Sequence, residues 1–234
     1  MENQLTCPSC RSAMQTFRSP RKTDGELTID LCFACQAVWF DEFESLQMAP
    51  SGVLDLFRQI NDHRDDPRQP WGDALDCPRC ERRLSQSFDL CKNGRFTYHR
   101  CSQEHGRFTA FSAFLMEKGF VRQMKGEEIA EMAKKVQTIR CSGCGAPVDI
   151  RREAVCGHCR SPIVILDPQA VDKALAGLVP ATAARHPAAM TSSLAARGRP
   201  GSYLSSDHRS DGSLIDSVDL VETGIEILWG LLGD

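Results

Sequence analysis

The clearest periodic pattern near the N-terminus is that of a β-strand. Leu27, Ile29 and Leu31 alternate with polar residues, which is typical of a strand with one covered face. A turn dipeptide, Asp24-Gly25, comes just before them. We therefore expect a strand near residues 14–17 to pair back across this turn and to form a β-hairpin with the alternating segment.

A second hairpin is indicated further along the chain. Asn93-Gly94 favours a two-residue turn and lies between the stretches 88–91 and 96–100. With this turn, Cys91 would face Phe96 across the two strands, as a small apolar residue in a packed position. A reactive thiol, or a metal ligand in place of a histidine, is the alternative role for Cys91.

Spacings of three and four residues predict the helices. The sharpest apolar stripe, within residues 53–60, predicts a short amphipathic helix. A final stripe over 214–232 predicts an amphipathic helix whose polar face is acidic. The members of the first three stripes are Val53, Leu56, Phe57 and Ile60; Phe111, Phe114, Leu115 and Val121; and Ile129, Met132, Ala133 and Val136.

Breaks in these patterns divide the chain into six segments. Two of them are polar or biased in composition and are interpreted as linkers, the longer one flexible because it is rich in Ala, Ser, Gly, Pro and Arg. The predicted segments are a first module with a helix at 1–61, a linker at 62–75, a second module with helices at 76–138, a third module at 139–168, a disordered linker at 169–213 and the amphipathic helix at 214–232.

Composition changes this picture, because the chain has 12 cysteines in 234 residues. Cysteines at this density form disulfides in an oxidising compartment or bind metal as thiolates in a reducing one. The first residues show no secretory signal pattern, and no apolar run is long enough for a membrane span. We therefore expect a cytoplasmic protein whose cysteines bind metal, with disulfide bonds as the alternative.

The cysteines fall into three sets with the spacing of zinc sites. Each set combines a Cys-x-x-Cys pair with a second pair of ligands, which suits the tetrahedral coordination of Zn²⁺. When the chain is shifted so that Cys77 falls on Cys7, Cys80 falls on Cys10 and His105 on Cys35, which favours His105 as a ligand and indicates an internal repeat. The three predicted sets are Cys7, Cys10, Cys32 and Cys35; Cys77, Cys80, Cys101 and His105; and Cys141, Cys144, Cys156 and Cys159.

A structural role is expected for the three zinc ions. Modules of about 25–45 residues are too small to be stable on a hydrophobic core alone, and a structural Zn²⁺ contributes about 10–16 kcal/mol that is coupled to folding. A site with four protein ligands has no open position for water, and the sequence holds no catalytic or phosphate-binding motif. We predict a small metal-stabilised α+β fold of three tandem zinc ribbons, with no catalytic residues and no small-molecule substrate.

The first module has a recognisable set of motifs: Cys7-Pro8-x-Cys10, Cys32-x-x-Cys35, Trp39-Phe40-Asp41 and Glu44. They resemble the bacterial zinc ribbons of the transcription factor IIB type. The resemblance implies a rubredoxin-like ribbon with four thiolate ligands, a site covered by Trp39, and a helix that starts at Asp41 and Glu44. Gln36 and Ala37 stand where that family usually has two glycines. The second module is similar to a diverged copy with His105 in place of a cysteine, and the third to generic four-cysteine ribbons.

The sequence leaves three functions open. The first is a non-catalytic interaction or adaptor protein that contacts a protein partner, with the 214–232 helix docking on that partner or folding back on its own chain. The second is a transcription-related nucleic-acid-binding protein that uses the basic region 79–107, where Phe96 and Tyr98 are available to stack on bases. The third is a rubredoxin-like iron electron carrier.

Charge favours the first of these functions. Residues 76–122 hold nine Lys or Arg against five Asp or Glu, but the whole chain has a formal net charge of −3. Nucleic-acid-binding proteins usually carry a basic surface. We therefore expect a zinc-binding interaction protein.

Overall fold

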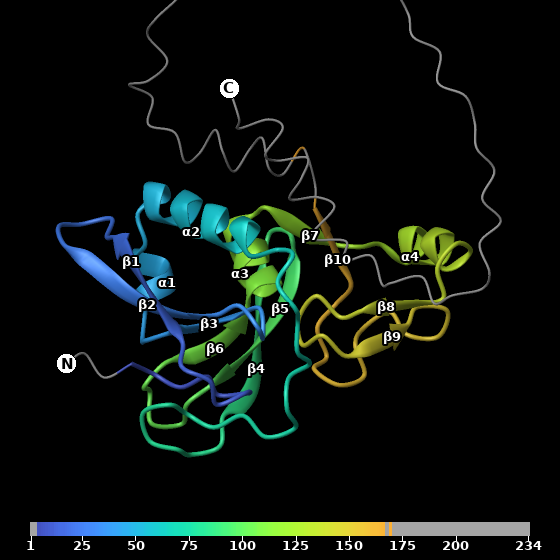
Figure 1. Cartoon of the computed structure of the whole chain (residues 1–234). Helices are drawn as coiled ribbons and strands as arrows, with labels where there is room; N and C mark the ends of the chain where they lie inside the picture. The colour runs from blue at the N-terminus through green and yellow to red at the C-terminus, as the bar shows by residue number, and fades with distance from the viewer. Residues whose placement is uncertain (1–3, 167–168, 170–234) are drawn as a thin grey trace, which may run out of the picture.

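The computed structural model describes residues 4–166 and Gln169 (Figure 1). The predicted helix 214–232 and the predicted linker 169–213, apart from Gln169, lie outside the described residues. Within 4–166, an antiparallel six-stranded sheet carries a few helices. The prediction of a small α+β fold is confirmed.

The main sheet consists of two three-stranded halves that meet in its middle. The strand order is β1-β2-β3-β6-β5-β4, and every neighbouring pair is antiparallel. At the junction, Ala37 lies opposite Ala110 and Phe40 opposite Arg107, so the halves share one sheet. The strands are β1 (Gln15–Pro20), β2 (Glu26–Cys32), β3 (Ala37–Phe40), β4 (Ser85–Cys91), β5 (Gly94–Arg100) and β6 (Arg107–Ala110).

Backbone features of the first half recur in the second at the offset that places Cys77 on Cys7. An isolated bridge between Thr6 and Ala13 precedes β1, and one between Asp76 and Arg83 precedes β4. The third strand of each half spans 37–40 and 107–110. Paired residues in the second hairpin are one residue closer along the chain than the corresponding pairs in the first. This explains why Cys101 falls one position away from Cys32 at the same offset.

The second hairpin turns one residue earlier than the sequence indicated. Cys91 pairs with Gly94, so Lys92 and Asn93 form the turn, and the residue opposite Phe96 is Asp89. The prediction that Cys91 faces Phe96 is therefore wrong. A tertiary contact fixes the turn, because the backbone oxygen and side-chain amide of Asn93 both bond to β7 (Val121–Gln123).

The helices follow the predicted stripes, except that Val121 and Val136, the last residues of two stripes, lie beyond the ends of the helices. In α2 (Pro50–Asp62), all four residues of the predicted stripe are buried. The helix α3 (Phe111–Lys118) ends at Gly119, which has a left-handed φ of 90° and terminates the helix. Val121 therefore lies in β7, and the prediction that it continues the helical stripe is wrong. The remaining helices are α1 (Glu44–Gln47) and α4 (Gly126–Ala133).

Both faces of the main sheet are covered near its centre. On one face the ring of Phe40 lies 5.6 Å from that of Phe114 in α3, and α2 packs with Phe57 5.2 Å from Phe120. On the other face, the ring centroid of Trp71 lies 4.7 Å from that of Phe108. Trp71 belongs to the stretch 62–75, which was interpreted as a linker. Beyond the end of α2 this stretch has no helix or strand but is packed against the sheet, and we call residues 68–75 the strap.

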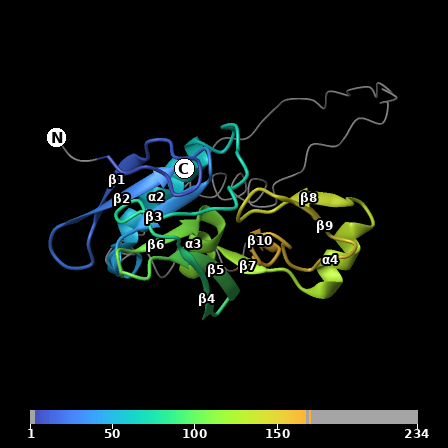
Figure 2. The ribbon, with the colours of Figure 1, turned by 90° about the horizontal axis from the view of Figure 1, so that it is seen from below.

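The last described part of the chain lies at one end of the sheet (Figure 2). It contains a small hairpin of β8 (Thr138–Arg140) and β9 (Pro147–Asp149), with α4 beside it. The final strand, β10 (Val164–Leu166), pairs with β7 instead of with this hairpin. The third part is thereby bound to the second through a two-stranded sheet.

Replacing Gly106 by alanine should destabilise the fold. Its φ is 138°, and an added Cβ would lie 2.1 Å from the backbone oxygen of Phe40. We expect a loss of about 1–3 kcal/mol in the free energy of unfolding, as for other overpacked sites, measured by chemical denaturation of the metal-loaded protein. Gly126→Ala is the control, because no atom lies within 4 Å of its added Cβ; equal losses in the two variants would contradict the packing account.

Candidate metal centres

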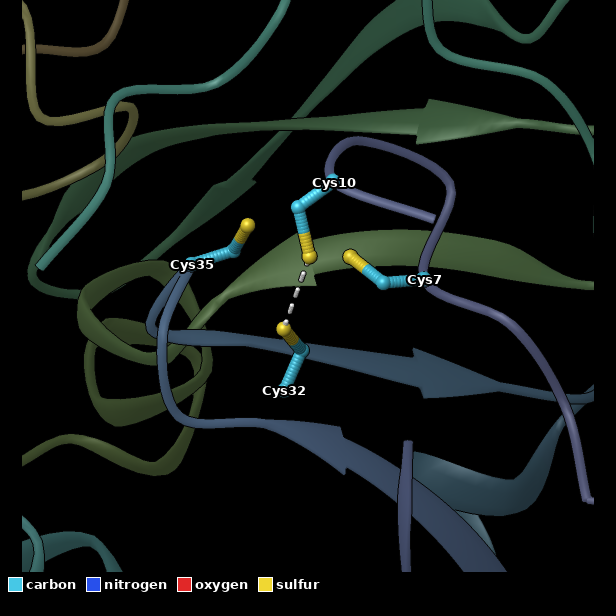
Figure 3. Close-up of side chains that lie close together, drawn as sticks. All are labelled: Cys7, Cys10, Cys32 and Cys35. Carbon is cyan, nitrogen blue, oxygen red and sulfur yellow. Dashed lines mark hydrogen bonds between the residues drawn. The ribbon is translucent and has the colours of Figure 1, made fainter. Parts of the chain in front are cut away.

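The structure brings all twelve predicted metal-ligating side chains together in three groups of four. Within each group the possible ligand atoms all lie within 4.8 Å of one another. Figure 3 shows the four cysteines of one group pointing toward a common point, from the 7–10 loop, from the end of β2 and from the turn that follows β2. We call the groups the first centre (Cys7, Cys10, Cys32, Cys35), the second centre (Cys77, Cys80, Cys101, His105) and the third centre (Cys141, Cys144, Cys156, Cys159).

Distances between the sulfur atoms fit a shared metal ion rather than disulfide bonds. The Sγ atoms of Cys10 and Cys32 are 3.6 Å apart, and two sulfur pairs of the third centre are 3.5 and 3.7 Å apart. Tetrahedral coordination with Zn–S bonds of about 2.3 Å places neighbouring sulfurs about 3.8 Å apart. A disulfide requires about 2.05 Å, and all twelve cysteines are free thiols.

The second centre includes a histidine nitrogen. His105 Nδ1 lies 3.7 Å from Cys77 Sγ and 3.6 Å from Cys101 Sγ. Zinc bonds of about 2.0–2.1 Å to nitrogen and 2.3 Å to sulfur give a separation of about 3.6 Å. Cys91 lies outside the group, with its thiol 3.3 Å from the backbone oxygen of Gly94 and 3.4 Å from that of Met116.

The five Cys-x-x-Cys loops share one backbone geometry. In four of them the carbonyl of the first cysteine accepts an N–H from the residue four positions later. In all five, the residue directly after the second cysteine has a left-handed backbone. These residues and their φ values are Arg11 at 62°, Gln36 at 47°, Glu81 at 59°, Gly145 at 77° and Arg160 at 58°.

This geometry is strained for most of the residues that adopt it. A left-handed conformation costs a non-glycine residue about 1–2 kcal/mol and persists only where the surroundings enforce it. Gln36 adopts the turn although no glycine stands at its position. A structural zinc ion contributes about 10–16 kcal/mol, which is enough to offset the strain in each centre.

At least one thiol in each group resists ionisation when no cation is present. Hydrogen bonds with Cys32 and Cys35 raise the pKa of Cys7, and the same kind of contact with Cys144 raises that of Cys141. Burial raises the pKa of Cys77 to about 12. Four buried thiolates therefore cannot coexist near neutral pH without a cation, whereas a divalent ion deprotonates the thiols that coordinate it. The donor set thus fits a divalent metal.

The strap connects the first and third centres through Trp71. Its backbone N–H donates to the oxygen of Cys144 at 2.8 Å, and its indole N–H donates to the oxygen of Cys35, also at 2.8 Å. The backbone N–H of Gln69 donates to the oxygen of Ala34 at 2.7 Å. The sequence interpretation missed this role, and its only signal was a tryptophan in an otherwise polar stretch.

A bidentate ion pair connects the second centre to the first half of the sheet. Arg79, within the 77–80 loop, donates from Nε to Asp41 at 2.9 Å and from Nη2 at 2.5 Å. The indole N–H of Trp39 donates to the same carboxylate at 2.8 Å. Trp39 is therefore buried beside Asp41, and the tryptophan that hydrogen-bonds to the first centre is Trp71.

The helix α1 starts at Glu44, as expected, but Asp41, which was also expected at its start, is not its N-cap. The N-cap of α1 is Phe43, and Glu44 Oε2 accepts the backbone N–H of Asp41 at 2.8 Å.

Burial raises the pKa of Glu44 to about 7 and, with help from Asp41, that of Asp30 to about 6. A carboxyl with a raised pKa stabilises the fold at low pH, and this contribution is lost as the pH rises through the folded-state pKa.

Comparisons with protein-family models, with curated proteins and with solved structures gave no match. Within the described part of the chain, no helix has the length and apolar character needed to cross a membrane. The geometry of the three centres is therefore the basis on which a function can be assigned.

His105→Ala should remove one metal ion from the protein. With only three donors left in the second centre, the metal content should fall from three ions per chain to two, as measured by elemental analysis after dialysis. His105→Cys should keep three ions, because it recreates the four-thiolate set of the first centre. Cys91→Ser is the control and should also keep three; loss of metal in that variant but not in His105→Ala would make Cys91 the ligand.

Proposed function

We propose that this protein is a non-catalytic zinc-binding scaffold that presents its surface to a protein partner in a reducing compartment such as the cytoplasm. The observation that carries the proposal is the closed donor set of each centre. Each group offers four protein ligands, and all four cysteines of the third centre are buried. Such a set leaves no coordination position for a substrate.

Zinc is the metal that suits all three centres. Four-cysteine and three-cysteine-one-histidine sets are typical of structural zinc sites. Iron also occupies four-thiolate sites, so the first and third centres would accept it. His105 in the second centre departs from the four-thiolate pattern of a rubredoxin-like electron carrier, which makes that function the weaker proposal.

We also infer that the two halves of the sheet are diverged copies of one zinc ribbon. Support comes from the isolated bridges, which lie at equivalent positions in the two halves, and from the equivalent bounds of β3 and β6. The pairing of β3 with β6 then joins two ribbons side by side. In this interpretation, the metal ions stabilise ribbons that have little core of their own.

The basic region 79–107 gives little support to nucleic-acid binding. Three of its arginines are engaged within the protein: Arg79 pairs with Asp41, Arg107 with Glu117, and Arg95 stacks 4.3 Å above the ring of Phe88. Phe96, one of the two aromatic residues expected to stack on bases, is only 4% exposed. These contacts account for three of the arginines without a phosphate backbone, whereas Arg82 and Arg100 are exposed.

Cobalt substitution tests whether the centres are closed. Protein refolded with Co²⁺ should show the intense visible bands of tetrahedral thiolate coordination, and added azide should leave them unchanged, because no ligand position is free. The same titration on a Co²⁺-substituted catalytic zinc enzyme provides the positive control. A shift of the bands on addition of azide would reveal an open position and would overturn the non-catalytic proposal.

A further inference from the structure

A groove of about 490 Å³ lies between the segment 41–46 and the β4–β5 hairpin. Phe96 and Tyr98 of β5 line it, as do Arg107 and Glu117, which pair with one another. We propose that this groove binds an amphipathic helix of a partner protein, with lysine or arginine residues beside its apolar face. The proposal rests on the scaffold function and names where the partner binds.

The walls of the groove expose an unusual amount of apolar surface. Five large apolar side chains are exposed among the described residues, and three of them line this groove. Phe43, Leu46 and Leu90 are exposed by 61%, 60% and 77%. Phe43 also has a left-handed φ of 64°, which is uncommon for a bulky residue and costs free energy. Apolar side chains gathered in one groove are typical of a protein-binding surface.

The charge of the residues that line the groove indicates what kind of partner segment would bind there. Five acidic residues line the groove against two arginines. Asp41 and Glu117 are paired with Arg79 and Arg107. Glu42 and Glu104, by contrast, are exposed at the groove, and the described residues show no ion pair for either. An acidic rim beside the exposed apolar side chains of the walls complements a basic amphipathic segment.

The first half of the sheet shows what covers the corresponding surface. The cross-strand pair Ser19–Leu27 occupies the position in the first hairpin that Asp89–Phe96 occupies in the second. Ser19 and Leu27 are both buried, and α2 packs on Ser19 so closely that a Cβ on Gly52 would lie 2.0 Å from Ser19 Oγ. An amphipathic helix therefore covers this position in the first hairpin, whereas in the second hairpin Phe96 is buried but Asp89 is exposed and lines the groove.

The predicted helix 214–232 of the same chain has the wrong charge for this groove. Its charged residues are Asp216, Asp219, Glu222 and Glu226, and it contains no lysine or arginine. Placed against an acidic rim, these carboxylates would be repelled. The charge of the groove therefore favours a second protein over the tail of this chain.

A labelled synthetic amphipathic peptide of leucine and lysine tests the proposal. Fluorescence anisotropy with the full-length, zinc-loaded protein should show saturable binding that weakens as salt is raised. Leu46→Ser and the double variant Glu42→Lys/Asp89→Lys should each weaken binding at least tenfold. Phe88→Ser, an exposed apolar residue outside the lining, and Glu127→Lys/Glu131→Lys, which makes the same charge change on α4, should stay within twofold.

Several results would overturn the proposal. They are absence of binding, equal binding of a leucine–glutamate peptide, and equal losses in the groove variants and their matched controls. Displacement of the probe by a peptide of residues 214–232 with similar affinity would assign the groove to the chain's own tail. Each of these results, obtained on protein whose Co²⁺ form resists azide, rejects the groove and leaves the scaffold function standing.

Discussion

Four ligand groups held within 4.8 Å of one another at each centre are the constraint on which the rest of this structure depends. Contacts with neighbouring thiols raise the pKa values of Cys7 and Cys141, and burial raises that of Cys77. A divalent cation would coordinate the thiolates directly and would thereby stabilise ionised groups that are unfavourable without it. A bound metal ion would also hold in place the left-handed residues after the second cysteines, which are not glycine in four of the five loops.

Hydrogen bonds and an ion pair also connect the three centres to one another and to the main sheet. Trp71 bonds to the backbone of the first and third centres, and Arg79 extends from the second centre to Asp41 in the first half. The main sheet continues across both halves through β3 and β6. These contacts link the three centres, and the three parts form one packed body rather than three independent modules.

The sequence was informative where chemistry is local. Ligand spacing indicated the three groups, and the stripe of α2 indicated its buried face, because both patterns lie within short stretches of chain. Contacts between distant segments escaped this reasoning. Asn93 is held in its turn by β7, and Gly119 ends α3 before Val121. In the strap, Trp71 is held by hydrogen bonds to residues far away in the chain. The groove likewise combines the 41–46 segment with a hairpin from the other half of the sheet.

The central claim is that the fold is organised by three closed metal centres with one cysteine left over. Native mass spectrometry of the purified full-length chain, combined with rapid alkylation of the same sample, tests it most directly. The account predicts three zinc ions per chain, protection of every cysteine in the three centres from alkylation, and modification of Cys91 alone. Fewer ions with several rapidly modified cysteines, or disulfide-linked peptides in place of metal, would contradict it.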